Sequence, residues 1–351
     1  MNFKKSSIVL MASAVLATSL SAREQIKIVG SSTVYPFSSS VAEEFGATTK
    51  YPTPVVESTG TGGGMKLFCA GVDINTPSIA NASRQMKKSE FEACKENGVT
   101  DITEALIGFD GIAIAQSSKI KSFNITKEQL ALALAKEVPS ADGKFLVANP
   151  YKKWSDISSS LPNREIIVYG PPKSSGTRDS FEEMILQAVF SKMPLFTDLY
   201  KKDEKANKKY KSYSEIRTDG VYVESGENDN LIVQRLTKNE AAIGIFGYSF
   251  LTENQDKMVA LSIDNILPTV ENISSSKYPV ARSMYFYIKN EHNKTNPALQ
   301  EFANLFMSEK MIADDGILTE IGLIPLNEKD RKNAQDIVKN SQKLKLESLN
   351  H

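Results

Sequence analysis

Three loops rich in glycine, serine and threonine are the segments of this sequence best suited to chemistry. They cover residues 30–36 (GSSTVYP), 58–66 (STGTGGGMK) and 173–181 (KSSGTRDSF). A loop of this kind that enters a helix presents unpaired backbone N–H groups and a partial positive charge, which attract an oxyanion. Its hydroxyl groups donate to further oxygens, and an arginine such as Arg178 holds two oxygens of a tetrahedral anion at once. The loops therefore predict an anion-binding site.

Each motif also has a simpler interpretation when it is taken by itself. Ser175 is a typical helix N-cap, and a glycine run such as 60–64 is often only a flexible turn. The run does not match a P-loop, because Met65 stands where that motif has glycine, and it does not match the dinucleotide fingerprint. Arg84 alone indicates a solvated charge, and Asp110 alone a turn or cap residue before an apolar strand. The anion-binding hypothesis depends on the loops acting together.

The elements around these loops predict an α/β protein. Apolar runs typical of buried strands occur at residues 26–29, 55–56, 112–115, 166–169, 241–246 and 285–288. Helical patterns lie between them, for example at residues 41–45, 180–190 and 230–236. This alternation favours α/β lobes with largely parallel sheets, in which ligands bind at the carboxyl ends of strands. The three loops occupy such positions.

The composition is that of an ordinary globular protein without a dominant charge. The chain has 351 residues, of which 41% are hydrophobic and 24% charged, and this is enough material for two cores. It carries 42 basic and 42 acidic side chains, so it has no general basic field that would hold nucleic acid. Any positive charge that binds an anion must therefore be local.

The N-terminus has the pattern of a secretory signal peptide. Lys4 and Lys5 precede an apolar run at residues 8–16, which is too short to span a bilayer, and small and polar residues follow up to Ala22. A buried N-terminal helix is the alternative, but the polar residues 23–25 and a new strand follow at once. We therefore expect residues 1–22 to be cleaved and the protein to be periplasmic. Since no cysteine lies near the cleavage zone, we expect no lipid anchor.

Cys69 and Cys94 are the two cysteines of the chain. In an oxidising compartment such a pair predicts a disulfide, and two buried free thiols are the alternative. The chain has two histidines, His292 in a polar stretch and His351 at the end. We find no spacing typical of metal ligands, so we expect neither a metal site nor a cofactor.

Taken in order, the motifs resemble those of the phosphate-binding proteins of bacterial high-affinity phosphate ABC importers. The resemblance runs from about Ile26 to about Pro325 and is carried by residues 30–36, 60–64, 82–84, 175–178, 227–229, 242–248 and 278–282. It implies a type II periplasmic binding protein fold, in which two lobes joined by crossing segments clasp the ligand in a cleft. We expect one lobe to comprise residues 23–112 plus 276–351, and the other residues 113–275.

The resemblance also implies a set of ligand residues. In the first loop, Ser32, Thr33 and Val34 would supply hydroxyl and backbone donors. Thr61 stands in place of a family serine, and the donor loop at a helix N-terminus corresponds to Ser175, Gly176 and Thr177. Arg84 stands where the best-known members have an acidic residue, and Pro171 stands where they have an arginine. Arg84 and Arg178 would then form two guanidinium clamps. Another carboxylate must accept the ligand proton, first Asp110 and next Asp179.

We therefore expect a monomeric protein that captures inorganic phosphate and delivers it to the membrane permease subunits of an ABC importer. One alternative is a receptor for sulfate, molybdate, tungstate or a phosphonate. Another is a secreted phosphohydrolase with Ser175 as the nucleophile, but this enzyme would need a nearby histidine or metal. An adhesion or structural protein is compatible with export but gives no reason for the three loops.

Overall fold

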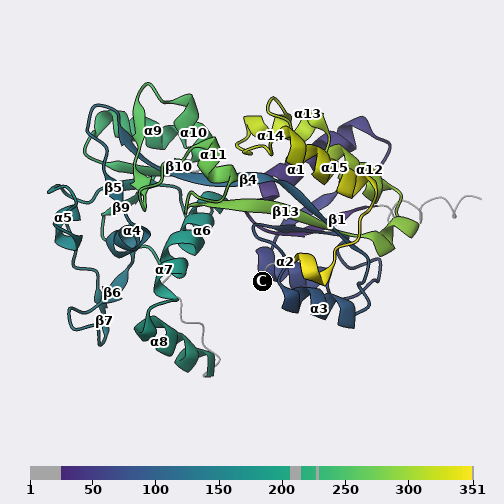
Figure 1. Ribbon diagram of the computed structural model, residues 1–351, viewed down its shortest axis with the longest axis horizontal. Coiled ribbons are helices and arrows are strands. Elements are labelled where there is room, and N and C mark those ends of the chain that lie inside the picture. Colours follow the sequence, from purple (N-terminus) through teal and green to yellow (C-terminus); the bar gives the residue numbers. More distant parts are fainter. Residues whose placement is uncertain (1–24, 206–214, 227–228, 350–351) are drawn as a thin grey trace, which may run out of the picture.

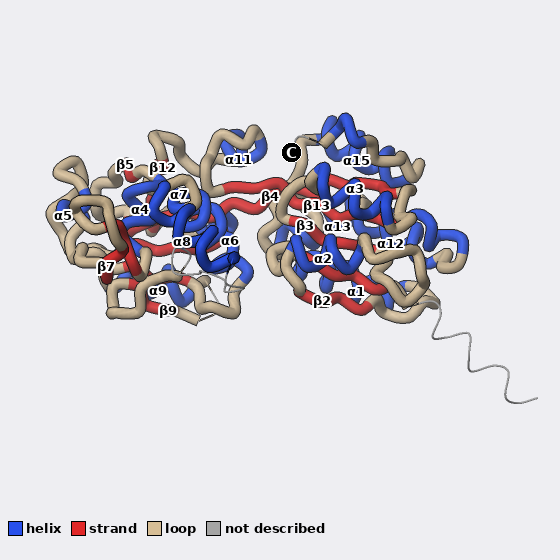
Figure 2. The backbone as a smooth tube through the Cα atoms, turned by 90° about the horizontal axis from the view of Figure 1, so that it is seen from below, coloured by secondary structure: helices blue, strands red, loops and turns tan. Residues whose placement is uncertain are grey.

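The protein consists of two α/β bodies placed side by side (Figure 1). The computed structural model describes residues 25–205, 215–226 and 229–349. The predicted signal peptide and residues 227–228 lie outside the described residues. The long strand β4 (Ile102–Ser117) and strand β13 (Ala281–Lys289) connect the two bodies, as Figure 2 shows from another side. The predicted α/β class and two-lobed arrangement are confirmed.

A mixed sheet runs through both lobes in the order β2-β1-β3-β13-β4-β10-β8-β9, and β11 also pairs with β4. Its remaining strands are β1 (Lys27–Gly30), β2 (Val55–Ser58), β3 (Ile79–Ala82), β8 (Val168–Gly170), β9 (Tyr222–Glu224), β10 (Ile243–Gly247) and β11 (Met258–Ala260). Each predicted strand overlaps one of these or lies in β4 or β13. The outer pairs are parallel, as expected. The prediction of largely parallel sheets is wrong for the middle, where β4 and β13 cross between the lobes in opposite directions and pair antiparallel.

In the first lobe, helices cover both faces of the sheet (Figure 1). On one face lie α1 (Tyr35–Thr48), α12 (Ala298–Phe306), α13 (Glu309–Ile312), α14 (Ile317–Glu320) and α15 (Glu328–Lys339); on the other lie α2 (Thr61–Phe68) and α3 (Lys88–Glu96). The short 3₁₀ helices at Asn290–Lys294 and Leu346–Ser348 complete this lobe.

The glycine run of the second loop forms the start of α2 rather than a flexible turn. A Cβ atom on Gly64 would lie 2.4 Å from the Cα atom of Gly30, so glycine lets α2 pack directly onto β1. The predicted disulfide is confirmed, since Cys69 at the end of α2 is bonded to Cys94 in α3. The disulfide therefore ties together the two helices on this face.

In the second lobe, β4 is buried on both faces. Ile112 and Ile114 join one apolar cluster, whereas Ala113 and Ala115 join another with α9 (Asn230–Lys238) and α10 (Tyr248–Glu253). This two-sided burial explains a continuous apolar run without alternation. The lobe also contains α4 (Lys127–Leu134), α5 (Trp154–Ile157), α6 (Gly176–Phe181), a π-helical turn (Glu182–Gln187), α7 (Ala188–Phe190), α8 (Pro194–Lys205), α11 (Val270–Ser274), and the strands β5 (Asn124–Ile125), β6 (Glu137–Pro139), β7 (Leu146–Ala148) and β12 (Ser262–Ile263).

Strand β4 changes its neighbour at the junction between the lobes. Residues 102–111 of this strand pair with β13, and residues 112–116 pair with β10. Asp110 lies just before the change, directly opposite Arg282 of β13 in the strand register. Within the residues that the structure describes, no helix is long and apolar enough to cross a membrane.

Candidate anion-binding cleft

The first loop and the start of α6 meet across the cleft between the lobes. The Ser32 hydroxyl donates to Oδ2 of Asp179 at 3.2 Å, and Oγ1 of Thr33 lies 3.0 Å from Oγ of Ser180. A Cβ atom on Gly176 would come within 3.0 Å of the Ser32 carbonyl oxygen, so glycine permits this close approach. The predicted loops from the two lobes therefore face each other.

Two hollows flank this contact, and both are lined in part by Ser32 and Thr33. We name them after one lining residue each. The Arg84 hollow is also lined by Thr61, Ser83, Arg84, Lys87, Asp179, Glu182, Glu183 and Arg282. The Asp110 hollow is also lined by Asp110, Ser174, Ser175, Gly176, Thr177 and Asp229. Among the predicted ligand residues, Val34 is buried at the N-cap of α1 and lines neither hollow.

Arg84 lines its hollow but is tied to a carboxylate. Its two terminal nitrogens donate to the two oxygens of Glu90, at 2.9 and 2.7 Å. Although burial acts in the opposite direction, hydrogen bonds from Arg84 and from the Lys87 backbone hold the pKa of Glu90 below its usual value. Most of the charge of Arg84 is thus neutralised locally. Nearby, Oγ1 of Thr61 lies 3.0 Å from Oγ of Ser83.

Arg178 is not brought together with the other predicted ligand residues. Its side chain is buried inside the second lobe, where Nε donates to Glu182 at 2.6 Å and one terminal nitrogen donates to the Pro171 carbonyl at 3.3 Å. The guanidinium stacks on the Tyr222 ring, 4.5 Å from its centroid. Arg178 does not line the Arg84 hollow or the Asp110 hollow. This arrangement gives no support to a direct contact with an anion.

Arg282 occupies the cleft instead, although no ligand contact was predicted for it from the sequence motifs. One terminal nitrogen donates to the hydroxyls of Thr33 and Ser180, and the other donates to Glu183 at 3.0 Å. Its Nε lies 3.6 Å from Oδ2 of Asp110, which is an ion-pair distance but too long for a hydrogen bond. The available signal was a charged residue at the start of an apolar strand, within the family-like segment 278–282.

Asp110 and Arg282 each have a buried atom that lacks a hydrogen-bond partner among the described residues. These atoms are Oδ2 of Asp110 and Nε of Arg282. Burial raises the pKa of Asp110, and the charge of Arg282 acts in the opposite direction. Unpaired buried polar atoms are rare in native proteins and call for a reason, such as a ligand that completes their hydrogen bonds. The pair lies between the two hollows, where such a ligand would bind.

The histidine in the described part of the chain lies elsewhere. Nδ1 of His292 is 2.9 Å from the Ser78 hydroxyl and Nε2 is 3.2 Å from the Val72 carbonyl oxygen, all within the first lobe. Ser175 is an N-cap, because its hydroxyl oxygen accepts from the Thr177 backbone at 3.2 Å. Among the described residues no group of His, Cys, Asp and Glu could hold a metal ion. The Ser175 hydroxyl therefore serves as the N-cap of α6.

Comparison with known proteins agrees with this architecture. Residues 17–310 match the family model of the PBP superfamily domain. Protein SphX of Synechococcus elongatus is 33% identical over 85% of this chain and 76% of its own, and the phosphate-binding protein PstS of Staphylococcus saprophyticus is 30% identical over 89% and 83%. The crystal structure of a possible phosphate-binding protein from Planctomyces limnophilus matches with a TM-score of 0.71 at 26% identity, covering 91% of this chain and 99% of that one. The chain therefore belongs to the PBP superfamily and, within it, to the PstS-like family of extracytoplasmic substrate-binding proteins, which are components of transporters and not enzymes.

Proposed function

We propose that this protein captures inorganic phosphate in the cleft between its lobes and delivers it to the membrane permease subunits of an ABC importer. The observation that carries the proposal is the meeting of the first loop, α6 and Arg282 at one place. Hydroxyl donors, backbone N–H groups at helix starts and a guanidinium are the groups that bind a tetrahedral oxyanion. The relatives named as phosphate-binding proteins support phosphate as the anion.

The ligand contacts that we propose come from both lobes. Hydroxyls and backbone amides of the hollows supply the donors: Ser32, Thr33, Thr61, Ser175, Gly176 and Thr177. Since the Val34 side chain is buried, this residue would contribute only through its backbone. Arg84 would add positive charge at the rim. Asp110 would accept a hydrogen bond from the protonated oxygen of phosphate, which favours phosphate over sulfate because sulfate carries no proton near neutral pH.

The boundaries of the lobes and the state of the protein belong to the same proposal. We infer one lobe from residues 23–112 plus 276–351 and a second from residues 113–275, which is supported by the change of strand neighbours next to Asp110. We further infer an exported monomer that binds its ligand without catalysis and has no nucleic-acid partner. The capping role of the Ser175 hydroxyl supports binding rather than nucleophilic attack.

Isothermal titration of the purified mature chain with phosphate, sulfate and molybdate tests this function. We expect phosphate to bind most tightly, and mass spectrometry of gently purified protein to find phosphate bound. Tighter binding of sulfate or molybdate would overturn the assignment of the ligand. Turnover of a chromogenic phosphate ester that disappears in Ser175→Ala would favour the phosphohydrolase.

A further inference from the structure

We propose that Arg282, on the connecting strand β13, is the main cationic contact of the bound anion, with the hydroxyls of Thr33 and Ser180 as its neighbours. This inference rests on the proposed function, because it names the residue that holds the anion captured there. Neither Arg282 nor Ser180 was among the ligand residues expected from the sequence. Three features support the inference: the position of Arg282, the hydrogen bonds of Arg282 and the other charges of the cleft.

The position of Arg282 is fixed by the sheet. It is the second residue of β13 and lies directly opposite Asp110 of β4, and these strands are the two long connections between the lobes. One terminal nitrogen of the guanidinium contacts both Thr33 of the first loop and Ser180 of the second lobe, and the other contacts Glu183 of the second lobe. An anion on this guanidinium would therefore touch both lobes at once, as the cleft of a two-lobed binding protein requires.

The hydrogen bonds of Arg282 do not use all of its donors. One terminal nitrogen donates to two neutral hydroxyls, and Nε has no hydrogen-bond partner among the described residues. The Asp110 carboxylate lies 3.6 Å from Nε, and the carboxylate that accepts a hydrogen bond, Glu183, has a half-exposed side chain. A guanidinium in these surroundings can exchange its contact with Glu183 for an anion oxygen. The charge-assisted hydrogen bonds that result are strong because little water reaches the site.

The other charges of the cleft make a buried cation necessary. Asp179, Glu182 and Glu183 line the Arg84 hollow and repel an anion. Of the other cations that line this hollow, Arg84 is held by both oxygens of Glu90, and Lys87 is exposed to solvent. Arg178 is buried against Tyr222 and lines neither hollow. Arg282 is thus the cation of the described cleft that combines burial, access to the hollow and an unused donor.

Substitutions of Arg282, compared with a matched control variant, test the inference. The variants are Arg282→Gln and Arg282→Lys, and the control is Arg331→Gln. The side chains of Arg282 and Arg331 are both 9% exposed, and both arginines form two ion pairs, but Arg331 lies on α15, away from the cleft. Isothermal titration of the mature chain with inorganic phosphate should show about 30-fold weaker binding or more for Arg282→Gln, as expected for truncation of a buried charge contact. The phosphate affinity of Arg282→Lys should lie between those of Arg282→Gln and the wild type, because lysine keeps the charge but lacks the planar fork. Arg331→Gln should bind phosphate like the wild type.

Thermal unfolding of each variant shows whether it is folded. A second measurement, on the wild type, does not depend on the folding of any variant. In a phosphate titration followed by NMR, we expect the Arg282 Nε–H resonance to shift with the same saturation curve as the calorimetric binding. A resonance that does not move, or a folded Arg282→Gln that binds phosphate as tightly as Arg331→Gln, overturns the inference while the proposed function stands. A wild-type protein that does not bind phosphate at all overturns the proposed function itself.

Discussion

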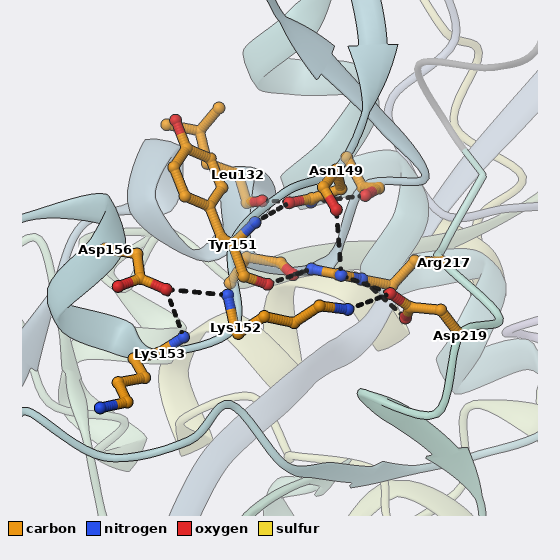
Figure 3. Close-up of polar contacts among 10 residues, drawn as sticks. Leu132, Asn149, Tyr151, Lys152, Lys153, Asp156, Arg217 and Asp219 are labelled. Carbon is orange, nitrogen blue, oxygen red and sulfur yellow. Dashed lines mark hydrogen bonds and ion pairs between the residues drawn. The ribbon is translucent and has the colours of Figure 1, made fainter.

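Two buried arginines of this molecule have opposite surroundings. Arg217 lies in the second lobe with a side chain that is 2% exposed, and each of its five N–H groups has an acceptor (Figure 3). It donates to the carbonyls of Ala133, Asn149 and Tyr151 and twice to Asp219, at distances of 2.5 to 3.3 Å. Arg282 is nearly as buried, yet its Nε has no hydrogen-bond partner among the described residues.

This difference separates an arginine that holds the fold from one that is open to a ligand. The Arg217 cluster is complete: hydrogen bonds from Arg217 and Lys152 hold the pKa of Asp219 well below its usual range, and Asn149 donates to the carbonyls of Leu132 and Ala135. Nothing in it remains for another molecule to satisfy. The Arg282 cluster at the junction of the lobes is incomplete. Burial alone therefore does not identify a site, whereas unused hydrogen-bonding capacity in a cleft does.

The largest effect should follow from breaking the complete cluster. Arg217→Ala leaves three carbonyls and Asp219 without their donor, so we expect the free energy of unfolding to fall by about 3 kcal/mol. Urea denaturation measures this loss, with Arg235→Ala on the exposed face of α9 as the control. Phosphate affinity of the folded variant should stay unchanged. If Arg217→Ala weakens phosphate binding as strongly as Arg282→Gln, the distinction between the two clusters fails.

Arg178 gives the comparison an intermediate case. It is buried and ion-paired like Arg217, but its hydrogen bonds among the described residues go to Glu182 and the Pro171 carbonyl, whereas Arg217 makes five. We expect Arg178→Ala to lower the free energy of unfolding by about 2 kcal/mol through loss of the ion pair and of the stacking on Tyr222. We also expect it to weaken phosphate binding much less than Arg282→Gln does. Parallel denaturation and titration experiments check both expectations, and the reverse ranking of affinities would return Arg178 to the ligand set.

The elements of the fold were largely predictable because burial leaves a clear pattern. Strand β4 is apolar without alternation between Ile112 and Ala115, as a strand covered on both faces must be. The disulfide followed from export and an isolated pair of cysteines. The antiparallel middle of the sheet was not predictable from such patterns, since strand direction depends on how β4 and β13 cross between lobes, and no local residue preference records that crossing.

The candidate site was predictable where its residues are consecutive and not where they meet only in space. The glycine, serine and threonine content of the loops predicted Ser32, Thr33 and residues 175–177. Arg178 shares that composition, yet the helix turns its side chain away from the hollows and into the lobe. Arg282 could be assigned to the site only after the strand register placed it opposite Asp110, which is 282 − 110 = 172 positions away in the chain. Long-range pairing therefore decided the roles of the arginines.

Asp110 tests the incomplete cluster from its acidic side. Asp110→Asn keeps the shape but removes the acceptor for the ligand proton, so the ratio of phosphate to sulfate affinity should fall at least about tenfold, or about 1.4 kcal/mol. Titrations with both anions measure the ratio. An unchanged ratio would mean that the acceptor lies elsewhere.

The same variant has a separate effect on the pH dependence of stability. Because burial raises the pKa of Asp110, the folded state binds its proton more tightly than the unfolded state does. The resulting stabilisation is complete below the ordinary pKa of 3.8 and is lost as the pH rises through the higher pKa of the folded state. We expect the stability of Asp110→Asn, relative to the wild type, to increase over that range. Denaturation curves across the acidic range check this, and parallel curves would contradict it.

The smallest effect should come from the solvent-facing edge of the complete cluster. Nζ of Lys152 lies 3.0 Å from Oδ2 of Asp219, but the two side chains are 64% and 40% exposed. Because water screens this pair, and Arg217 already supplies two hydrogen bonds to the same carboxylate, Lys152→Ala should cost less than about 1 kcal/mol of unfolding free energy. The loss should nearly vanish at 1 M salt, where the screening length falls to about 3 Å. Lys136→Ala, which removes a similarly exposed ion pair with Glu215, is the matched control. A loss that exceeds that of the control and persists at high salt would show that Lys152 belongs to the buried cluster. The cluster would then extend to the protein surface instead of ending at Arg217.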